Sequence, residues 1–392
     1  MKYKTKKKSL KLKIYIVDSN ILVRQMLMNM LKSVSGVDSV VLENKIDPEL
    51  ILSNIRENEP NLLMLSVDDL ESKQMDLFYE LRKQFPKLPV ALLTPLNKMG
   101  ANVAVTGLRH GAVDFVTKPD QSNGVIFAGN HFKKRVLPIL QLLPEINENR
   151  ITERHSSYSV REQVSGDQFH SLRDKALNAE FLSFSGCMGG VKSLFQVIAQ
   201  LPAKLPVPVV IVQHMPKIYT RELARQLDLV TALNVREATD GSLLLPGQIY
   251  VSPGGYHTEI KNDGTRRYLR IHRGPREHIS RPSIDVMLRS AVKVYGNRVL
   301  SVFLSGAGSD GISGASLVLE NGGEVIVESR ESSLVWDTPG KIANMHSNLQ
   351  HVRSDEIGSE IMKSIISTQK WMGIRSKIKQ KINLENGFNE LL

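Results

Sequence analysis

Short apolar runs separated by helical stretches recur along both halves of this 392-residue chain. Each run has the length of one buried strand, and several end in polar residues. Strands that alternate with helices form parallel sheets, in which polar residues collect at the carboxyl ends of the strands. The expected strands lie at residues 12–17, 62–65, 90–93, 112–116, 181–184, 207–212, 248–251, 299–304 and 324–327. The pattern therefore predicts an α/β protein with two doubly wound parallel-sheet domains.

Between the two halves, apolar residues lose their period, and Glu, Asn, Arg, Ser and Gln dominate. This composition is typical of a linker. We predict a basic arm at 1–11, a first domain at 12–135, a linker at 136–178, a second domain at 179–370 and a tail at 371–392.

The single cysteine excludes an intramolecular disulfide and favours a reducing compartment. No apolar run reaches the length of a membrane span, and the lysine-rich N-terminus lacks the apolar stretch of a signal peptide. We therefore expect a cytoplasmic protein. The formal net charge of +11 suits an acidic partner, whereas the 6% aromatic content and the lack of a recognisable module argue against nucleic acid.

Candidate catalytic side chains follow three strands of the second domain: Cys187, His214 and Asp310. Cys187 lies in a glycine turn before a helical stretch, where the positive end of the helix favours a thiolate. Because the carboxyl ends of parallel strands meet at one crevice, the three can serve as nucleophile, base and orienting acid. Each alone also fits an apolar filler, a structural histidine or a turn former. Their combination favours catalysis.

Five motifs of the second domain, taken together, resemble the chemotaxis protein-glutamate methylesterase family; they lie at 184–190, 210–216, 251–257, 281–286 and 304–311. In that family a response-regulator receiver domain is joined by a linker to a methylesterase domain. The resemblance covers roughly residues 12–365. It implies hydrolysis of glutamyl methyl esters on methyl-accepting chemoreceptors, with release of methanol, and deamidation of receptor glutamines.

The same resemblance implies no cofactor for hydrolysis, a chemotaxis histidine kinase as a further partner, and contact with the membrane only through the receptors. Because receptor signalling helices are acidic, a basic surface would suit this substrate. A run of arginines supplies one, although a solvated basic loop explains the run equally well. These residues are Arg266, Arg267, Arg270, Arg273, Arg276 and Arg281.

The chain departs from the family pattern beside the expected nucleophile. The family carries serine where Cys187 stands, threonine where Met188 stands, and usually methionine at the position of Ala307. A thiolate paired with histidine is intrinsically nucleophilic, so cysteine can replace serine. We favour an esterase that uses Cys187 in place of serine. The alternative is a catalytically weakened or inactive module that binds receptor or kinase.

The first domain also departs from its receiver relatives, in which an acidic pair binds Mg²⁺ and a third aspartate is phosphorylated. Here Asp18 is followed by Ser19, so one member of the acidic pair is replaced. Thr94 and Lys118 match the residues that contact the phosphoryl group in the family. With fewer carboxylates, Asp18 would hold Mg²⁺ only weakly.

The phosphoacceptor position has two candidates. The end of the third apolar run places Ser66 there, which cannot form an acyl phosphate, whereas a count back from Asp76 selects Asp69. We favour Ser66, because the strand pattern ends at that residue. The expected result is a degenerate receiver that acts as a phosphorylation-independent regulatory cover.

Overall fold

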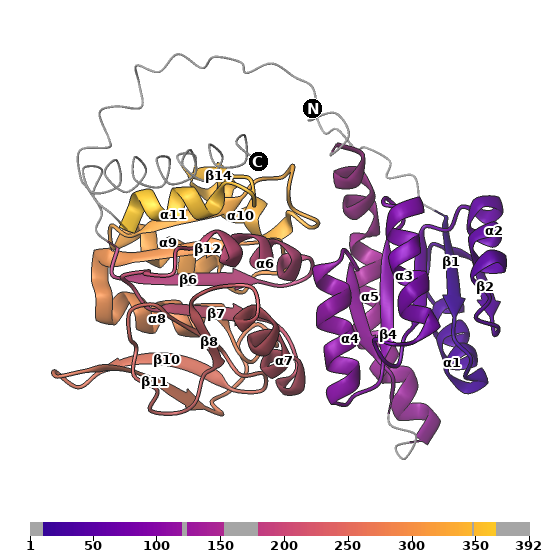
Figure 1. Cartoon of the computed structure of the whole chain (residues 1–392), viewed down its shortest axis with the longest axis horizontal. Coiled ribbons are helices and arrows are strands. Elements are labelled where there is room, and N and C mark those ends of the chain that lie inside the picture. Colours follow the sequence, from indigo (N-terminus) through magenta and orange to yellow (C-terminus); the bar gives the residue numbers. More distant parts are fainter. Residues whose placement is uncertain (1–10, 120–123, 153–178, 347–348, 366–392) are drawn as a thin grey trace, which may run out of the picture.

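The computed structural model describes residues 11–119, 124–152, 179–346 and 349–365. Two α/β domains lie side by side, each built on a parallel sheet flanked by helices (Figure 1). This arrangement confirms the predicted fold class. The expected C-terminal tail at 371–392, and all but Lys11 of the expected basic arm, lie outside the described residues. Within the described part, no helix is long and apolar enough to cross a membrane.

The first domain has a five-stranded sheet in the order β2-β1-β3-β4-β5. The direction of strand addition reverses between β1 and β3, and such a reversal opens a crevice at the carboxyl ends of the strands. The strands are β1 (Leu12–Val17), β2 (Val37–Glu43), β3 (Leu62–Ser66), β4 (Val90–Thr94) and β5 (Asp114–Thr117). The helices are α1 (Ile21–Lys32), α2 (Pro48–Asn58), α3 (Lys73–Gln84), α4 (Lys98–Arg109) and α5 (Gly124–Thr152).

Helix α5 continues well beyond the expected end of the first domain. Its buried residues recur at helical spacing and pack into the core under the first sheet. They are Phe132, Val136, Ile139, Leu140, Leu143 and Ile146. The boundary expected between residues 135 and 136 therefore lies inside this helix. Proline usually ends a helix, but Pro138 and Pro144 both lie inside α5, so the full length of this helix is not evident from the sequence.

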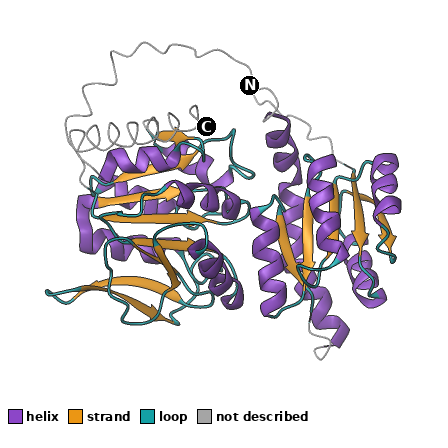
Figure 2. Cartoon of the chain, in the orientation of Figure 1, coloured by secondary structure: helices purple, strands orange, loops and turns teal. Residues whose placement is uncertain are grey.

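The second domain has a seven-stranded parallel sheet in the order β14-β13-β12-β6-β7-β9-β8. The strands are β6 (Phe181–Gly186), β7 (Val209–Gln213), β8 (Asn234–Glu237), β9 (Gln248–Val251), β12 (Val299–Phe303), β13 (Glu324–Glu328) and β14 (Gln350–Val352). The helices are α6 (Gly190–Gln200), α7 (Lys217–Asp228), α8 (Ile284–Tyr295), α9 (Ile312–Glu320), α10 (Asp337–Met345) and α11 (Ile357–Ile365), with a short 3₁₀ turn η2 (Gly296–Arg298). An antiparallel hairpin, β10 (His257–Asn262) and β11 (Arg267–His272), lies at one margin of the domain (Figure 2).

All nine expected strands coincide with observed strands to within a few residues. The strands that the sequence did not predict are β2, β8, β14 and the hairpin. They are edge strands or exposed ribbons with mixed polarity, so they lack the continuous apolar run that marks a strand buried on both faces.

The two domains are docked through helices α4 and α5 of the first domain, and α4 packs beside α7 of the second (Figure 1). The ring of Phe115 on β5 stacks on Tyr219 of α7, with ring centroids 4.4 Å apart. Gln226 of α7 donates to the side chain of Asn102 on α4 over 2.9 Å. Met188 and Val335 of the second domain join the apolar cluster that contains α5. The first domain therefore lies directly against the carboxyl end of the second sheet.

Candidate active site

Cys187, His214 and Asp310 lie together at the carboxyl ends of β6, β7 and β12, which are neighbours in the order β12-β6-β7. The Nε2 atom of His214 is 2.8 Å from Oδ2 of Asp310. The thiol of Cys187 is hydrogen-bonded to the same imidazole. Since Nε2 is engaged by the carboxylate, Nδ1 is the nitrogen left for the thiol. The structure thus brings all three predicted residues into one hydrogen-bonded series.

The backbone around Cys187 is fixed by the two neighbouring strands. Its N–H donates to the carbonyl of Ser305 over 3.1 Å, and its carbonyl accepts from Nε2 of Gln213 over 2.7 Å. A β-carbon on Gly306 would lie 3.1 Å from the β-carbon of Cys187, so glycine lets the loop after β12 approach this closely without displacing Cys187. Gly189, with φ of 81°, then turns the chain into α6. The thiol is held at the amino end of a helix.

Asp310 is held by the first turn of α8. Its Oδ1 accepts hydrogen bonds from Ser283 Oγ and the Asp285 N–H, over 2.8 and 3.1 Å. Its Oδ2 accepts from the Ile284 N–H over 2.8 Å, in addition to the bond with His214. Burial opposes ionisation, but the hydrogen bond and charge of His214, together with the backbone donors, leave the pKa of Asp310 below its ordinary value. The carboxylate is therefore ionised and oriented.

The imidazole and the thiol stabilise each other's charged forms. Burial disfavours the imidazolium, yet the hydrogen bonds to Asp310 and Cys187 raise the pKa of His214 to about 10. Burial likewise opposes the thiolate, and the buried carboxyl of Asp114 acts in the same direction. The hydrogen bond and charge of His214 outweigh both and lower the pKa of Cys187. Both shifts favour a thiolate beside an imidazolium.

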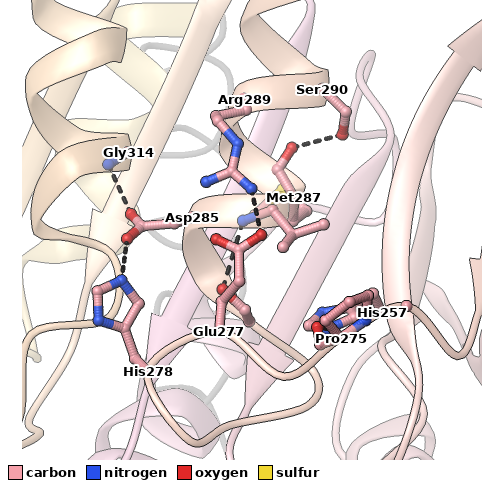
Figure 3. A network of polar contacts seen from close by, with 12 residues as sticks. His257, Pro275, Glu277, His278, Asp285, Met287, Arg289, Ser290 and Gly314 are labelled. Atoms are coloured by element: carbon pink, nitrogen blue, oxygen red, sulfur yellow. Dashed lines mark hydrogen bonds and ion pairs between the residues drawn. The ribbon is translucent and has the colours of Figure 1, made fainter.

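A second histidine–aspartate pair supports the loop that carries Asp310 (Figure 3). His278 Nε2 lies 2.8 Å from Oδ2 of Asp285, whose Oδ1 accepts from the N–H groups of Gly311 and Gly314. His278 Nδ1 is 3.0 Å from the hydroxyl of Ser309. Segments 283–285 and 309–314 are thereby joined on both sides of the Asp310 carboxylate. The sequence analysis did not single out His278, because it lies in a loop outside the five motifs.

Three of these side chains place ligand atoms within 4.8 Å of one another, as a metal site would: His278, Asp285 and Asp310. A carboxylate offers about four lone-pair sites for hydrogen bonds. Asp310 already accepts from His214, Ser283 and two backbone N–H groups. Its acceptor capacity is used, so this cluster is a hydrogen-bonded support of the active site and offers no open coordination position.

A groove of about 670 Å³ opens beside His214. Arg273, Arg276 and Arg281 line it, so half of the arginine run identified in the sequence faces the site. The other three arginines lie on or beside β11, away from the groove. Arg266 pairs with Asp263 and Arg267 with Glu180, over 2.9 and 3.1 Å, and Arg270 is exposed. Two further cations, Lys217 and Arg135, complete the lining of the groove.

The corresponding edge of the first sheet holds the predicted receiver residues. Asp18 is fully buried, and its Oδ2 lies 3.7 Å from Nζ of Lys118. Lys118 also pairs with Asp68 over 2.7 Å, a residue that the sequence analysis missed because it weighed only positions 66 and 69. Thr94 is buried, with its hydroxyl 3.4 Å from the hydroxyl of Tyr219 in the second domain.

The two acceptor candidates lie in different environments. Ser66 is the last residue of β3 and is buried beside this pocket. Asp69 accepts from the N–H of Glu71 over 2.9 Å and shapes the turn before α3. For Mg²⁺, the available carboxylates are those of Asp18 and Asp68. Both lie beside the ammonium of Lys118, which offsets one of their two negative charges and competes with a divalent cation, so these residues fit such an ion poorly.

A model of the CheB methylesterase family matches residues 184–361. The protein-glutamate methylesterase/protein-glutamine glutaminase of Trichodesmium erythraeum is 29% identical over 361 residues, which are 91% of this chain and 99% of that protein. A relative of the same description from Xanthomonas euvesicatoria is 29% identical over 354 residues, 89% of this chain and 96% of the relative.

Among solved structures, the CheB methylesterase catalytic domain of Thermotoga maritima is 31% identical to the matching part of this chain. The match covers 47% of this chain and 98% of that domain, with a TM-score of 0.46. The sequence relatives cover both domains and the five motifs predicted to carry the chemistry. Residues 184–361 therefore belong to the CheB methylesterase family, and the chain is similar over about nine tenths of its length to protein-glutamate methylesterases/protein-glutamine glutaminases.

Proposed function

We propose that this chain is a carboxyl-ester hydrolase that removes methyl groups from glutamyl methyl esters of methyl-accepting chemoreceptors, and that it also deamidates receptor glutamines. Cys187 is the nucleophile, His214 the general base and acid, and Asp310 the residue that orients the imidazole. The observation that carries this proposal is the connected series of these three side chains at the ends of three adjacent strands. The reaction takes place in the cytoplasm, and hydrolysis requires no cofactor.

In the first step, the thiolate sulfur of Cys187 attacks the ester carbonyl carbon and forms a carbon–sulfur bond. The carbon–oxygen bond to the methoxy group breaks, and His214 Nδ1 gives its proton to the departing oxygen, so methanol leaves. A water molecule then attacks the thioester and gives a proton to His214, and the thiolate departs. The product is a glutamate side chain. With a glutamine substrate, ammonia leaves in place of methanol.

The surroundings of Cys187 favour this use of a thiol in place of a hydroxyl. A backbone N–H from Met188, at the amino end of α6, donates to the sulfur and stabilises its negative charge. His214 and Asp310 retain the geometry that a triad needs. A decayed site that served only for binding would have no chemical reason to preserve this ion pair. We therefore favour the enzyme over the inactive receptor- or kinase-binding module.

The cationic groove supports an acidic protein substrate. Five basic side chains line it next to His214, and opposite charge increases the rate of encounter and fixes orientation. For the receiver site we propose that regulation proceeds without aspartyl phosphorylation. A chemotaxis histidine kinase is then a binding partner at most, and Mg²⁺ at Asp18 is only weakly favoured.

The test is methanol release from methylated receptor membranes by the wild type and by Cys187→Ala and Cys187→Ser. We expect activity in the wild type and a loss of at least about a thousandfold in Cys187→Ala, because the covalent step is removed. Cys187→Ser restores the residue type of the family and retains measurable activity. A wild type that releases no methanol while still binding the receptor would refute the proposal and leave the binding module.

A further inference from the structure

The groove beside His214 is built by both domains. His214, Lys217 and three arginines come from the second domain, and Arg135 comes from helix α5 of the first. Thus, with the first domain docked, an open volume of about 670 Å³ still leads to the catalytic imidazole. A domain that acted only as a cover would be expected to fill this volume.

The lining of the groove is strongly one-sided in charge. It contains five arginine and lysine side chains, and no aspartate or glutamate is among the described residues that form it. Docking therefore brings Arg135 toward the other positively charged side chains of the groove, and this repulsion is unfavourable at short range. Asp114 on β5 partly balances Arg135 but does not line the groove. An anionic occupant would remove the remaining repulsion.

Arg135 is held in place by the domain interface itself. Its guanidinium lies over the ring of Phe115, 5.1 Å from the centroid, and that ring stacks on Tyr219 of the second domain. Cation–π contact of this kind fixes a guanidinium without neutralising it. Tyr219 lies two residues after Lys217, another residue of the groove. Docking thus presents Arg135 at a defined position with its charge available.

We propose that Arg135 is a substrate-binding residue, and that the docked first domain forms part of the site by contacting a carboxylate near the scissile glutamyl ester. The proposal rests on the proposed function and adds to it a composite, two-domain recognition surface for an acidic segment. An arginine is suited to this role because its planar guanidinium can bind a carboxylate through two parallel hydrogen bonds.

The test uses the full chain and synthetic receptor-like peptides with one glutamyl methyl ester, flanked either by glutamates or by glutamines. We expect Arg135→Gln to raise KM for the glutamate-flanked peptide by about threefold to tenfold, with kcat nearly unchanged, as for one partly exposed charged contact. The variant and the wild type should have equal KM for the glutamine-flanked peptide. Arg135→Lys should recover part of the loss.

Lys134 provides a matched control, because it is exposed on the same helix and does not line the groove. Lys134→Gln removes the same charge and should leave both peptides unaffected. An unchanged KM in Arg135→Gln, or an increase in kcat/KM for the glutamate-flanked peptide, would overturn the proposal, since the latter is the result of loosening a simple cover. An unchanged thermal unfolding midpoint shows that the variant is folded.

The two proposals fail in distinguishable ways. If the wild type releases methanol and Arg135→Gln behaves like it, the composite site is wrong and the esterase stands. If the wild type releases none, the esterase is wrong. The groove is then tested by fluorescence anisotropy, as binding of the glutamate-flanked peptide to the full chain with and without Arg135→Gln. A loss of affinity in the variant supports the recognition surface, and equal affinity refutes it.

Discussion

Both sheets carry polar side chains at the carboxyl ends of their strands. Only in the second sheet do hydrogen bonds link these side chains into one series. There, Asp310 accepts four hydrogen bonds, His214 bridges carboxylate and thiol, and the pKa values of both partners shift toward the ion pair. At the first sheet, the buried carboxylate of Asp18 faces the ammonium of Lys118, and Ser66 is the last residue of β3. The same architecture thus places a thiol–imidazole–carboxylate series at one edge and a lysine paired with two carboxylates at the other.

The comparison shows that the fold provides a location and the side chains decide its chemistry. A strand order that reverses opens a crevice in both domains. In the second, backbone N–H groups at the amino end of α8 donate to the Asp310 carboxylate, which keeps its negative charge. In the first, Lys118 offsets one of the two negative charges of Asp18 and Asp68.

The largest expected effect is that of Asp310→Asn. The amide cannot stabilise the imidazolium, so we expect kcat for methanol release to fall by about a hundredfold to ten-thousandfold. The matched change at the other sheet, Asp18→Asn, should leave kcat within about a factor of three, because that carboxylate takes no part in the reaction. Equal losses in the two variants would show that the second sheet alone does not carry the chemistry.

The next change adds a carboxylate at the carboxyl edge of the first sheet. Wild-type protein incubated with acetyl phosphate and Mg²⁺ should take up no hydroxylamine-labile phosphate, since a serine at position 66 cannot form an acyl phosphate. Ser66→Asp supplies a carboxylate beside Asp18, Thr94 and Lys118 and should become labelled, as measured by intact mass. Addition of Asp69→Asn to that variant should not change the labelling. Acyl phosphate at Asp68 or Asp69 in the wild type would contradict this account of the first domain.

A smaller effect is expected for His278→Gln. Loss of the hydrogen bond with Asp285 loosens the loop that carries Asp310, so kcat should fall by about tenfold with little change in KM. The pH midpoint of the thiol alkylation rate should also rise. Arg289→Gln is the matched control, because it breaks the exposed pair with Glu277 in the same region (Figure 3). Equal kcat values for His278→Gln and the wild type would assign this pair no positioning role.

The smallest expected effect is on how the free energy of unfolding depends on pH. The pKa of His214 rises from 6.5 to about 10 on folding, so its proton stabilises the fold fully below pH 6.5, and this stabilisation is lost as the pH rises through about 10. The free energy of unfolding of the wild type relative to His214→Gln should therefore decrease between pH 8 and pH 10.5. Urea titrations at both values measure it, and a constant or growing difference would contradict the assigned ion pair.

The sequence predicted the buried framework of both domains, because strands buried on both faces are continuous apolar runs. The position of Cys187, His214 and Asp310 at one edge followed from the rule that parallel strands end together. What could not be predicted are features made by packing across long sequence separations. Lys118 pairs with Asp68 and with neither Ser66 nor Asp69, the two positions weighed from the sequence. Arg135 lines a groove of the other domain while its guanidinium lies over the ring of Phe115. No local periodicity encodes either contact.

The central claim is that Cys187 is an activated thiolate, and its alkylation by iodoacetamide against pH tests this most directly. Because it is the only cysteine of the chain, the label reports one site. In the wild type, the rate should already reach its plateau well below pH 8.5, the ordinary thiol value, since the pKa of Cys187 is lowered by His214. In His214→Gln the midpoint should move to about 8.5 or above. A wild type that titrates near pH 8.5 and coincides with His214→Gln would contradict the account.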